Sequence, residues 1–223
     1  MKKLVVVLAI LMLLAACGGG GSGDDTSYAE KTFIINPPES YLPGYKTSFS
    51  LSGKDDRGER WSILSSSAVR GTTILFNETV FVSEQLFIMT FRETTTSELV
   101  TTYFRENHDP VYMIDQSGNA YAPVKISNTP TIATVGDFGA QSSWKDNNGN
   151  TITGTWNLEK AHDGLANLVF VSTYRDASGN TEFYQEMVIT IDESGDEKLI
   201  YLKWHYPNTG RTIEVSGNRI YDT

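Results

Sequence analysis

The sequence predicts an all-β fold, a large antiparallel up-and-down meander of about 10–13 strands, closed as a barrel or folded as a sandwich. Three observations lead to this prediction. Runs rich in β-branched and aromatic residues fill most of the 223-residue chain, the connections between them are short, and one turn pattern recurs at regular steps. Beyond the N-terminus, no stretch sustains the apolar period of a helix between capping residues.

The candidate strands follow one another with few interruptions. Connections such as RGT, SE and TTTS are short enough for hairpins, so neighbouring strands should run antiparallel. The runs with the clearest strand composition are 47–53, 60–69, 73–82, 85–91, 98–104, 168–174, 183–191 and 199–206.

A turn pattern of Asp, two variable residues, Gly and then Asn, Asp or Glu occurs repeatedly. The Asp side chain can accept hydrogen bonds from backbone amides of the turn, and Gly can take the positive φ of a type I turn with a bulge. We therefore interpret the pattern as hairpin corners. The copies begin at Asp55, Asp115, Asp146, Asp176 and Asp192.

The spacing of the turns predicts the strand length in the second half. Candidate turns near Asp146, Asp163, Asp176, Asp192 and Asn208 are separated by 17, 13, 16 and 16 residues. Each step fits one long strand plus one tight turn, so alternate turns should lie on opposite rims.

Calcium binding is the alternative interpretation of these turns. An EF-hand-like loop needs alternating oxygen ligands, a Gly at its sixth position and a bidentate Glu at its twelfth. The turns here have Gly at the fourth position and no such Glu. The copy in which Asp146, Asn148 and Asn150 alternate comes nearest, and it keeps a calcium site open as an alternative. We expect no other metal and no cofactor.

One all-β domain is predicted over 46–223. An irregular, proline-containing stretch near 127–137 could join two similar halves, because SGKDDRGE at 52–59 aligns with SWKDNNGN at 143–150. The alternative is that turn-like composition alone produces this match.

The first residues have the features of an export signal. Two lysines follow the initiating Met, an apolar run covers 4–14, and small residues precede Cys17. The apolar run is shorter than the roughly 20 residues that a membrane-spanning helix needs. Leu14 to Cys17 read LAAC, which resembles the lipobox of bacterial lipoproteins.

This resemblance implies a lipid anchor. Residues 1–16 would be a removed signal peptide, and Cys17, the only cysteine, would carry a diacylglyceryl group on its thiol and an acyl chain such as palmitate on its amine. Residues 17–45 would then form the lipidated Cys and a flexible Gly/Ser-rich tether. An Asp at position 18 would resemble an inner-membrane retention signal. The chain has Gly18 there instead, which favours transfer to the outer membrane. The expected location is the cell envelope, with the domain in the periplasm or at the cell surface.

The charge of the chain excludes several partners. Loss of Lys2 and Lys3 with the signal peptide changes the formal charge from −9 to −11. This acidic balance argues against nucleic acid as a partner and against electrostatic adhesion to anionic lipid. Attachment to the membrane should therefore come from the lipid on Cys17.

Four tryptophans are the candidate ligand-binding residues. They could line a pocket for an apolar ligand, as in many barrels, although core packing is the interpretation we favour. The four are Trp61, Trp144, Trp156 and Trp204.

Catalytic motifs are missing from the sequence. The three histidines, His108, His162 and His205, lie on separate candidate elements, and there is no nucleophile elbow and no phosphate-binding glycine loop. The sequence therefore predicts a lipid-anchored envelope lipoprotein that acts as a non-catalytic binding or assembly module, with another envelope protein as a candidate partner. A barrel-type carrier of an apolar ligand is the alternative, and an uncharacterised periplasmic enzyme is the third.

Overall fold

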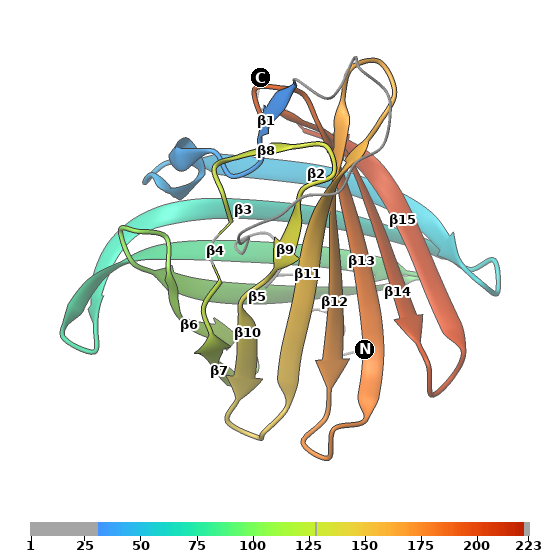
Figure 1. Cartoon of the computed structure of the whole chain (residues 1–223). Helices are drawn as coiled ribbons and strands as arrows, with labels where there is room; N and C mark the ends of the chain where they lie inside the picture. The colour runs from blue at the N-terminus through green and yellow to red at the C-terminus, as the bar shows by residue number, and fades with distance from the viewer. Residues whose placement is uncertain (1–30, 128, 221–223) are drawn as a thin grey trace.

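The computed structural model describes residues 31–127 and 129–220. Within them the predicted all-β fold is confirmed, and the meander closes as an antiparallel barrel of 12 strands (Figure 1). The barrel strands are β2 (Lys46–Asp55), β3 (Arg60–Leu75), β4 (Glu78–Phe91), β5 (Thr94–Phe104), β6 (Pro110–Asp115), β7 (Ala120–Lys125), β10 (Ser143–Asp146), β11 (Thr151–Lys160), β12 (Ala166–Arg175), β13 (Thr181–Ile191), β14 (Glu197–Tyr206) and β15 (Arg211–Arg219).

The barrel consists of two runs of six consecutive strands, β2–β7 and β10–β15, which meet at two seams. One seam is the β7–β10 ladder and the other is the β15–β2 ladder. The segment predicted to join two halves, near 127–137, lies between the runs and contains the short strand β8 (Ile132–Thr134), and β9 (Phe138–Ala140) follows it. The two similar sequence segments, 52–59 and 143–150, occupy equivalent places, because each includes the first hairpin turn of its run.

Alternate turns lie on opposite rims, as predicted. We call rim A the end that carries the turns beginning at Asp55, Asp115, Asp146 and Asp176. Rim B is the end that carries the β3–β4 turn, the β5–β6 turn, the β11–β12 turn and the turn beginning at Asp192.

The prediction that residues 31–45 belong to a tether is wrong. They form β1 (Thr32–Ile34), which pairs with β8, and the 3-10 helix η2 (Pro38–Tyr41). Phe33, Ile35 and Tyr41 are buried against the barrel. The three buried residues are irregularly spaced over nine positions and show no strand or helix period, so the sequence did not reveal this cap. Residues 17–30 lie outside the described residues.

The predicted strand boundaries in the first half need correction. RGT at 70–72 and SE at 83–84 are not turns, because β3 and β4 run through them as long paired strands. Gly71 marks a bulge in the ladder, with φ of 141°. The turn lies instead at Phe76 and Asn77, which both have positive φ without being glycine.

The barrel interior is filled by one large apolar cluster. Inward side chains alternate with outward ones along each strand, and the strands β2–β5 cross behind β11–β14 at a large angle, so the two walls pack face to face (Figure 1). All four tryptophans belong to this cluster. Among the described residues no helix has the length and hydropathy of a transmembrane span.

Two glycines let β15 and β2 approach closely at their seam. A Cβ atom on Gly53 would lie 1.9 Å from the carbonyl oxygen of Glu214, and one on Gly217 would lie 1.8 Å from that of Ser50. No rotamer change relieves a clash with backbone, so any side chain at either place forces the two strands apart.

Substitution of Gly217 tests this seam. We expect Gly217→Ala to lower the free energy of unfolding by about 1–3 kcal/mol, since an inserted methyl group overpacks the ladder. Ser216→Ala, on the exposed face of the same strand, should change it by less than about 0.5 kcal/mol. Urea denaturation followed by tryptophan fluorescence measures both, and equal effects would contradict the close approach.

Candidate functional site

The Asp-x-x-Gly turns are hairpin corners, as predicted. In each, the Asp amide donates to the carbonyl four residues later and the Gly amide donates to the Asp carbonyl. The carboxylate accepts the backbone amide of the fifth residue in every copy. The five glycines have φ between 76° and 93°. Local hydrogen bonding thus explains why Asp and Gly stand at these places.

The calcium alternative at Asp146 receives no support from the side-chain directions. One carboxylate oxygen accepts the amides of Asn148 and Asn150, at 2.9 and 2.8 Å. The other accepts the side-chain nitrogen of Asn150 at 2.7 Å, so Asn150 turns a donor toward the carboxylate. In the part of the chain that the structure describes, no three His, Cys, Asp or Glu side chains gather as a metal site would require.

The three histidines have different surroundings. His108 stacks on Tyr41, with ring centroids 3.8 Å apart, and burial lowers its pKa. His162 is exposed beside Asp163 on rim B. His205 lies on β14, where its Nδ1 is 3.0 Å from the hydroxyl of Thr212. The fold gives no place where these imidazoles act together.

The four tryptophans pack in the core. Trp144, Trp156 and Trp204 are at most 1% exposed, and the indole of Trp204 donates to the Oε1 atom of Gln185 at 3.0 Å. Trp61 stacks on Phe91, with ring centroids 4.4 Å apart. No tryptophan is among the residues that line the cavity described next.

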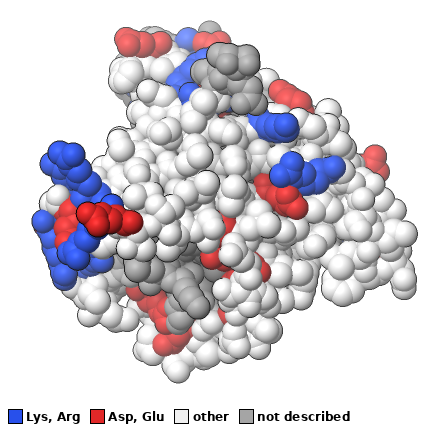
Figure 2. Space-filling model, turned by 180° about the vertical axis from the view of Figure 1, so that it is seen from behind, with Lys and Arg blue, Asp and Glu red and all other residues white. Residues whose placement is uncertain are grey.

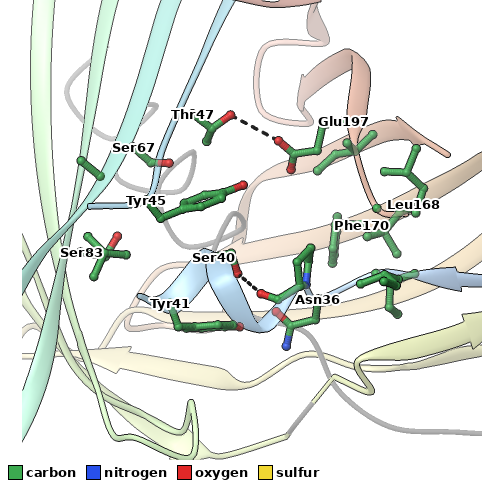
Figure 3. A pocket seen from close by; sticks show the side chains of 18 residues that line it. Asn36, Ser40, Tyr41, Tyr45, Thr47, Ser67, Ser83, Leu168, Phe170 and Glu197 are labelled. Atoms are coloured by element: carbon green, nitrogen blue, oxygen red, sulfur yellow. Dashed lines mark hydrogen bonds between the residues drawn. The ribbon is translucent and has the colours of Figure 1, made fainter. Parts of the chain in front are cut away.

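A cavity of about 90 Å³ lies inside rim B, beneath the cap formed by β1 and η2 (Figure 3). Its two walls differ in chemistry. One wall, from β2, β3 and β4, presents the hydroxyls of Thr47, Ser67 and Ser83. The opposite wall, from β12 and β13, is apolar and includes Leu168 and Phe170. The cap adds Asn36, Ser40, Tyr41 and Tyr45.

The polar wall continues into the barrel through side chains that lack hydrogen-bond partners. Gln85 faces Ser67 across the β3–β4 ladder, and Thr102 faces Ser83 across the β4–β5 ladder. Gln85 is 1% exposed, and within the described residues neither its amide oxygen nor its nitrogen has a partner. The hydroxyls of Ser65 and Thr102 are equally buried and unpaired. Unpaired buried polar groups are costly, but none of these three side chains lines the cavity itself.

Glu197 is the carboxylic acid among the residues that line the cavity. Its Oε2 atom accepts a hydrogen bond from Thr47 at 3.4 Å (Figure 3). Burial raises the pKa of Glu197 to about 7, although the positive charge of Arg219 opposes the shift. Arg219 donates to Asp196 at 2.8 Å. The burial and Glu197 together also raise the pKa of Tyr45.

Sequence reasoning missed this cavity. Glu197 directly follows an Asp-x-x-Gly turn and has no local signal of burial, and the serines of β3 are of a residue type that is mostly exposed. The alternation along β3 contained the necessary signal, since Ser65 and Ser67 point to the same face as the buried Trp61 and Ile63.

Charged side chains gather elsewhere. Figure 2 shows Lys and Arg beside Asp and Glu at the edge where the β2–β3 turn lies. Several are paired there: Arg211 donates to Asp55 at 2.5 Å and Arg92 pairs with Glu59. Burial opposes the ionisation of Asp55, but hydrogen bonds from Arg211 and from two backbone amides lower its pKa to about 2. This cluster joins the β15–β2 seam to the neighbouring turns.

Comparison with known proteins gives little further information. No family model and no curated protein matches the chain. A solved structure described as a candidate lipoprotein from Parabacteroides distasonis ATCC 8503 is 13% identical over 84% of this chain and 97% of that chain, with a TM-score of 0.35. A likeness this distant carries no argument about function.

The raised pKa of Glu197 predicts a pH dependence. A carboxyl that keeps its proton in the folded state contributes stability below its unfolded pKa, and this contribution is lost as pH rises from about 4.5 to about 7. The free energy of unfolding of Glu197→Gln should therefore fall less over this rise in pH than that of the wild type. Parallel urea titrations across the window measure the difference. Glu186→Gln, on the outward face of β13, should retain the wild-type dependence, and parallel curves for all three proteins would contradict the assignment.

Proposed function

We propose that the protein is a lipid-anchored lipoprotein of the bacterial cell envelope, whose barrel is a non-catalytic binding module. The anchor is supported by the LAAC motif, with Cys17 as its lipidated residue, and by the tether sequence behind it. Gly18 favours the outer membrane, with the barrel in the periplasm or at the surface. One acyl chain binds a membrane only marginally, whereas two or three bind it durably.

The binding role rests on one observation, a cavity with hydroxyls on one wall and apolar side chains on the other, next to a strip of unpaired buried polar groups. The amide of Gln85 and the hydroxyls of Ser65 and Thr102 need partners that the described residues do not supply. A guest in the cavity would meet hydroxyls on one side and apolar side chains on the other. The module therefore suits a small molecule, or a small group of a larger one, that has a hydroxyl or amide beside an apolar part.

The size of the cavity argues against the carrier alternative. Pockets for drug-sized ligands hold about 300–1,000 Å³. The cavity of about 90 Å³ has room for only a few heavy atoms, and the apolar cluster fills the space that a long apolar ligand would need. No observation of the structure favours an enzyme over a binding module.

Loss of the lipidated thiol tests the anchor. Cys17→Ser should abolish incorporation of a labelled fatty acid in cells and release the protein from the membrane fraction, because no other cysteine is available. Metabolic labelling followed by fractionation measures both. Ser22→Ala in the tether is the matched control and should label normally. Continued labelling of Cys17→Ser would contradict the anchor.

Occupation of the cavity tests the binding role. We expect 1-butanol, with one hydroxyl and a short apolar chain, to shift backbone amide resonances of residues that line the cavity in a saturable titration. Ser67→Leu should remove this response, because Ser67 lines the cavity and a larger side chain would fill it. Ser66→Leu, on the opposite face of β3, should respond as the wild type does. Unsaturable shifts spread over the barrel would contradict a specific site.

A further inference from the structure

The β3–β4 turn carries the two most exposed large apolar side chains among the described residues. Ile74 is 75% exposed and Phe76 is 67% exposed. Both lie at the end of the longest hairpin of the barrel, which Figure 1 shows extending beyond the neighbouring strands. We call Ile74 and Phe76 the hairpin tip. Exposed apolar groups that protrude together are typical of contact sites.

The fold does not explain phenylalanine at this turn. Phe76 has φ of 52° and Asn77 has φ of 65°, the left-handed conformations of a tight hairpin turn that favours Asn-Gly. A bulky residue is strained in this conformation. Within the protein, Phe76 gains an edge contact to Tyr112, with ring centroids 5.8 Å apart, while most of its surface stays in water.

The charges around the hairpin tip are compensated. Arg105 donates to Glu78 at 2.7 Å, and this contact lowers the pKa of Glu78, while Arg70 donates to Glu84 at 2.7 Å. On the face seen in Figure 2, no acidic or basic side chain covers the lobe where the β3–β4 turn lies. The charged edge at the β2–β3 turn lies on the opposite side. An apolar projection whose neighbouring charges are paired suits a low-dielectric surface and not an ionic partner.

The described chain begins on the same rim. Lys31 pairs with Glu193 of the β13–β14 turn on rim B, which also carries the hairpin tip. Thirteen residues, 18–30, separate Lys31 from Cys17. Even fully extended, thirteen residues span at most about 45 Å. A lipid on Cys17 would therefore hold residue 31, on rim B, within about 45 Å of the bilayer.

We propose that the hairpin tip inserts into the bilayer surface that holds the lipid anchor, which fixes the orientation of the barrel; the anchor itself rests on the proposed function. Ile74 and Phe76 enter the boundary between headgroups and acyl chains. Tyr112 and Tyr103, with ring centroids 6.5 Å apart, lie behind them, as aromatic side chains do at membrane interfaces. Because the protein is acidic, the contact is apolar and favours neutral lipid.

The test uses the single thiol of the chain. The protein from Cys17 onward, without its natural lipid, is coupled through Cys17 to a maleimide lipid in phosphatidylcholine vesicles with brominated acyl chains. In Phe76→Trp, the fluorescence added by the new indole should shift to the blue and be quenched by bromine. In Phe138→Trp, a matched exposed position on β9, the added fluorescence should remain unquenched. The wild type supplies the background of the four core tryptophans.

A second substitution separates insertion from chance proximity. Ile74→Asp combined with Phe76→Trp should lose the quenching, since a carboxylate beside the indole opposes entry into the bilayer. Quenching of the new indole in both Phe76→Trp and Phe138→Trp, or in neither of them, would overturn the proposal. Chemical coupling bypasses lipidation in the cell, so this result is independent of whether Cys17→Ser alters labelling there.

Discussion

The backbone ladder between β15 and β2 is the constraint on which the rest of the structure depends. It joins the last strand of the barrel to the first, pairing Ile213 with Asp55 at one end and Arg219 with Phe49 at the other. Without it the meander would be an open sheet with two unpaired edges. Closure also brings β12 and β13 opposite β3 and β4, so the core and the cavity both exist only because the ladder forms.

Closure at this seam has a steric condition. Gly53 and Gly217 face carbonyl oxygens of the opposite strand so closely that no side chain fits, and Arg211 bridges the seam to Asp55 at rim A. At rim B the cap contributes to a second small core, in which Tyr41 packs with Val69 and Phe104. The two ends of the barrel thus differ, one closed by charged pairs and the other by a capped cavity.

Local chemistry made much of this fold predictable. The Asp-x-x-Gly turns were found because each Asp bonds amides within its own turn, and their spacing set the strand lengths. What sequence reasoning missed depends on contacts between distant residues. The choice of a barrel over a sandwich depends on pairing β15 with β2, and the partly buried Glu197 lines a cavity whose cap begins before residue 46.

The missed turn at Phe76 has a different cause. Neither Phe76 nor Asn77 is a glycine, so the usual signal of a tight hairpin is absent, while Gly71 nearby suggested a turn that is a bulge. Phe76 adopts a backbone conformation that phenylalanine disfavours, at an exposed tip. Contact with a molecule outside the fold is a physical explanation for such a residue. The same reasoning applies to Gln85, whose buried amide is left without a partner in the described residues.

The proposed function and the orientation on the membrane both depend on the chemical state of residue 17. Mass spectrometry of the N-terminal peptide, from protein extracted from its own cell envelope, tests this most directly. We expect a peptide that begins at Cys17 and carries the added mass of a diacylglyceryl group. A peptide that includes residues before Cys17, or that begins at an unmodified residue, would contradict it.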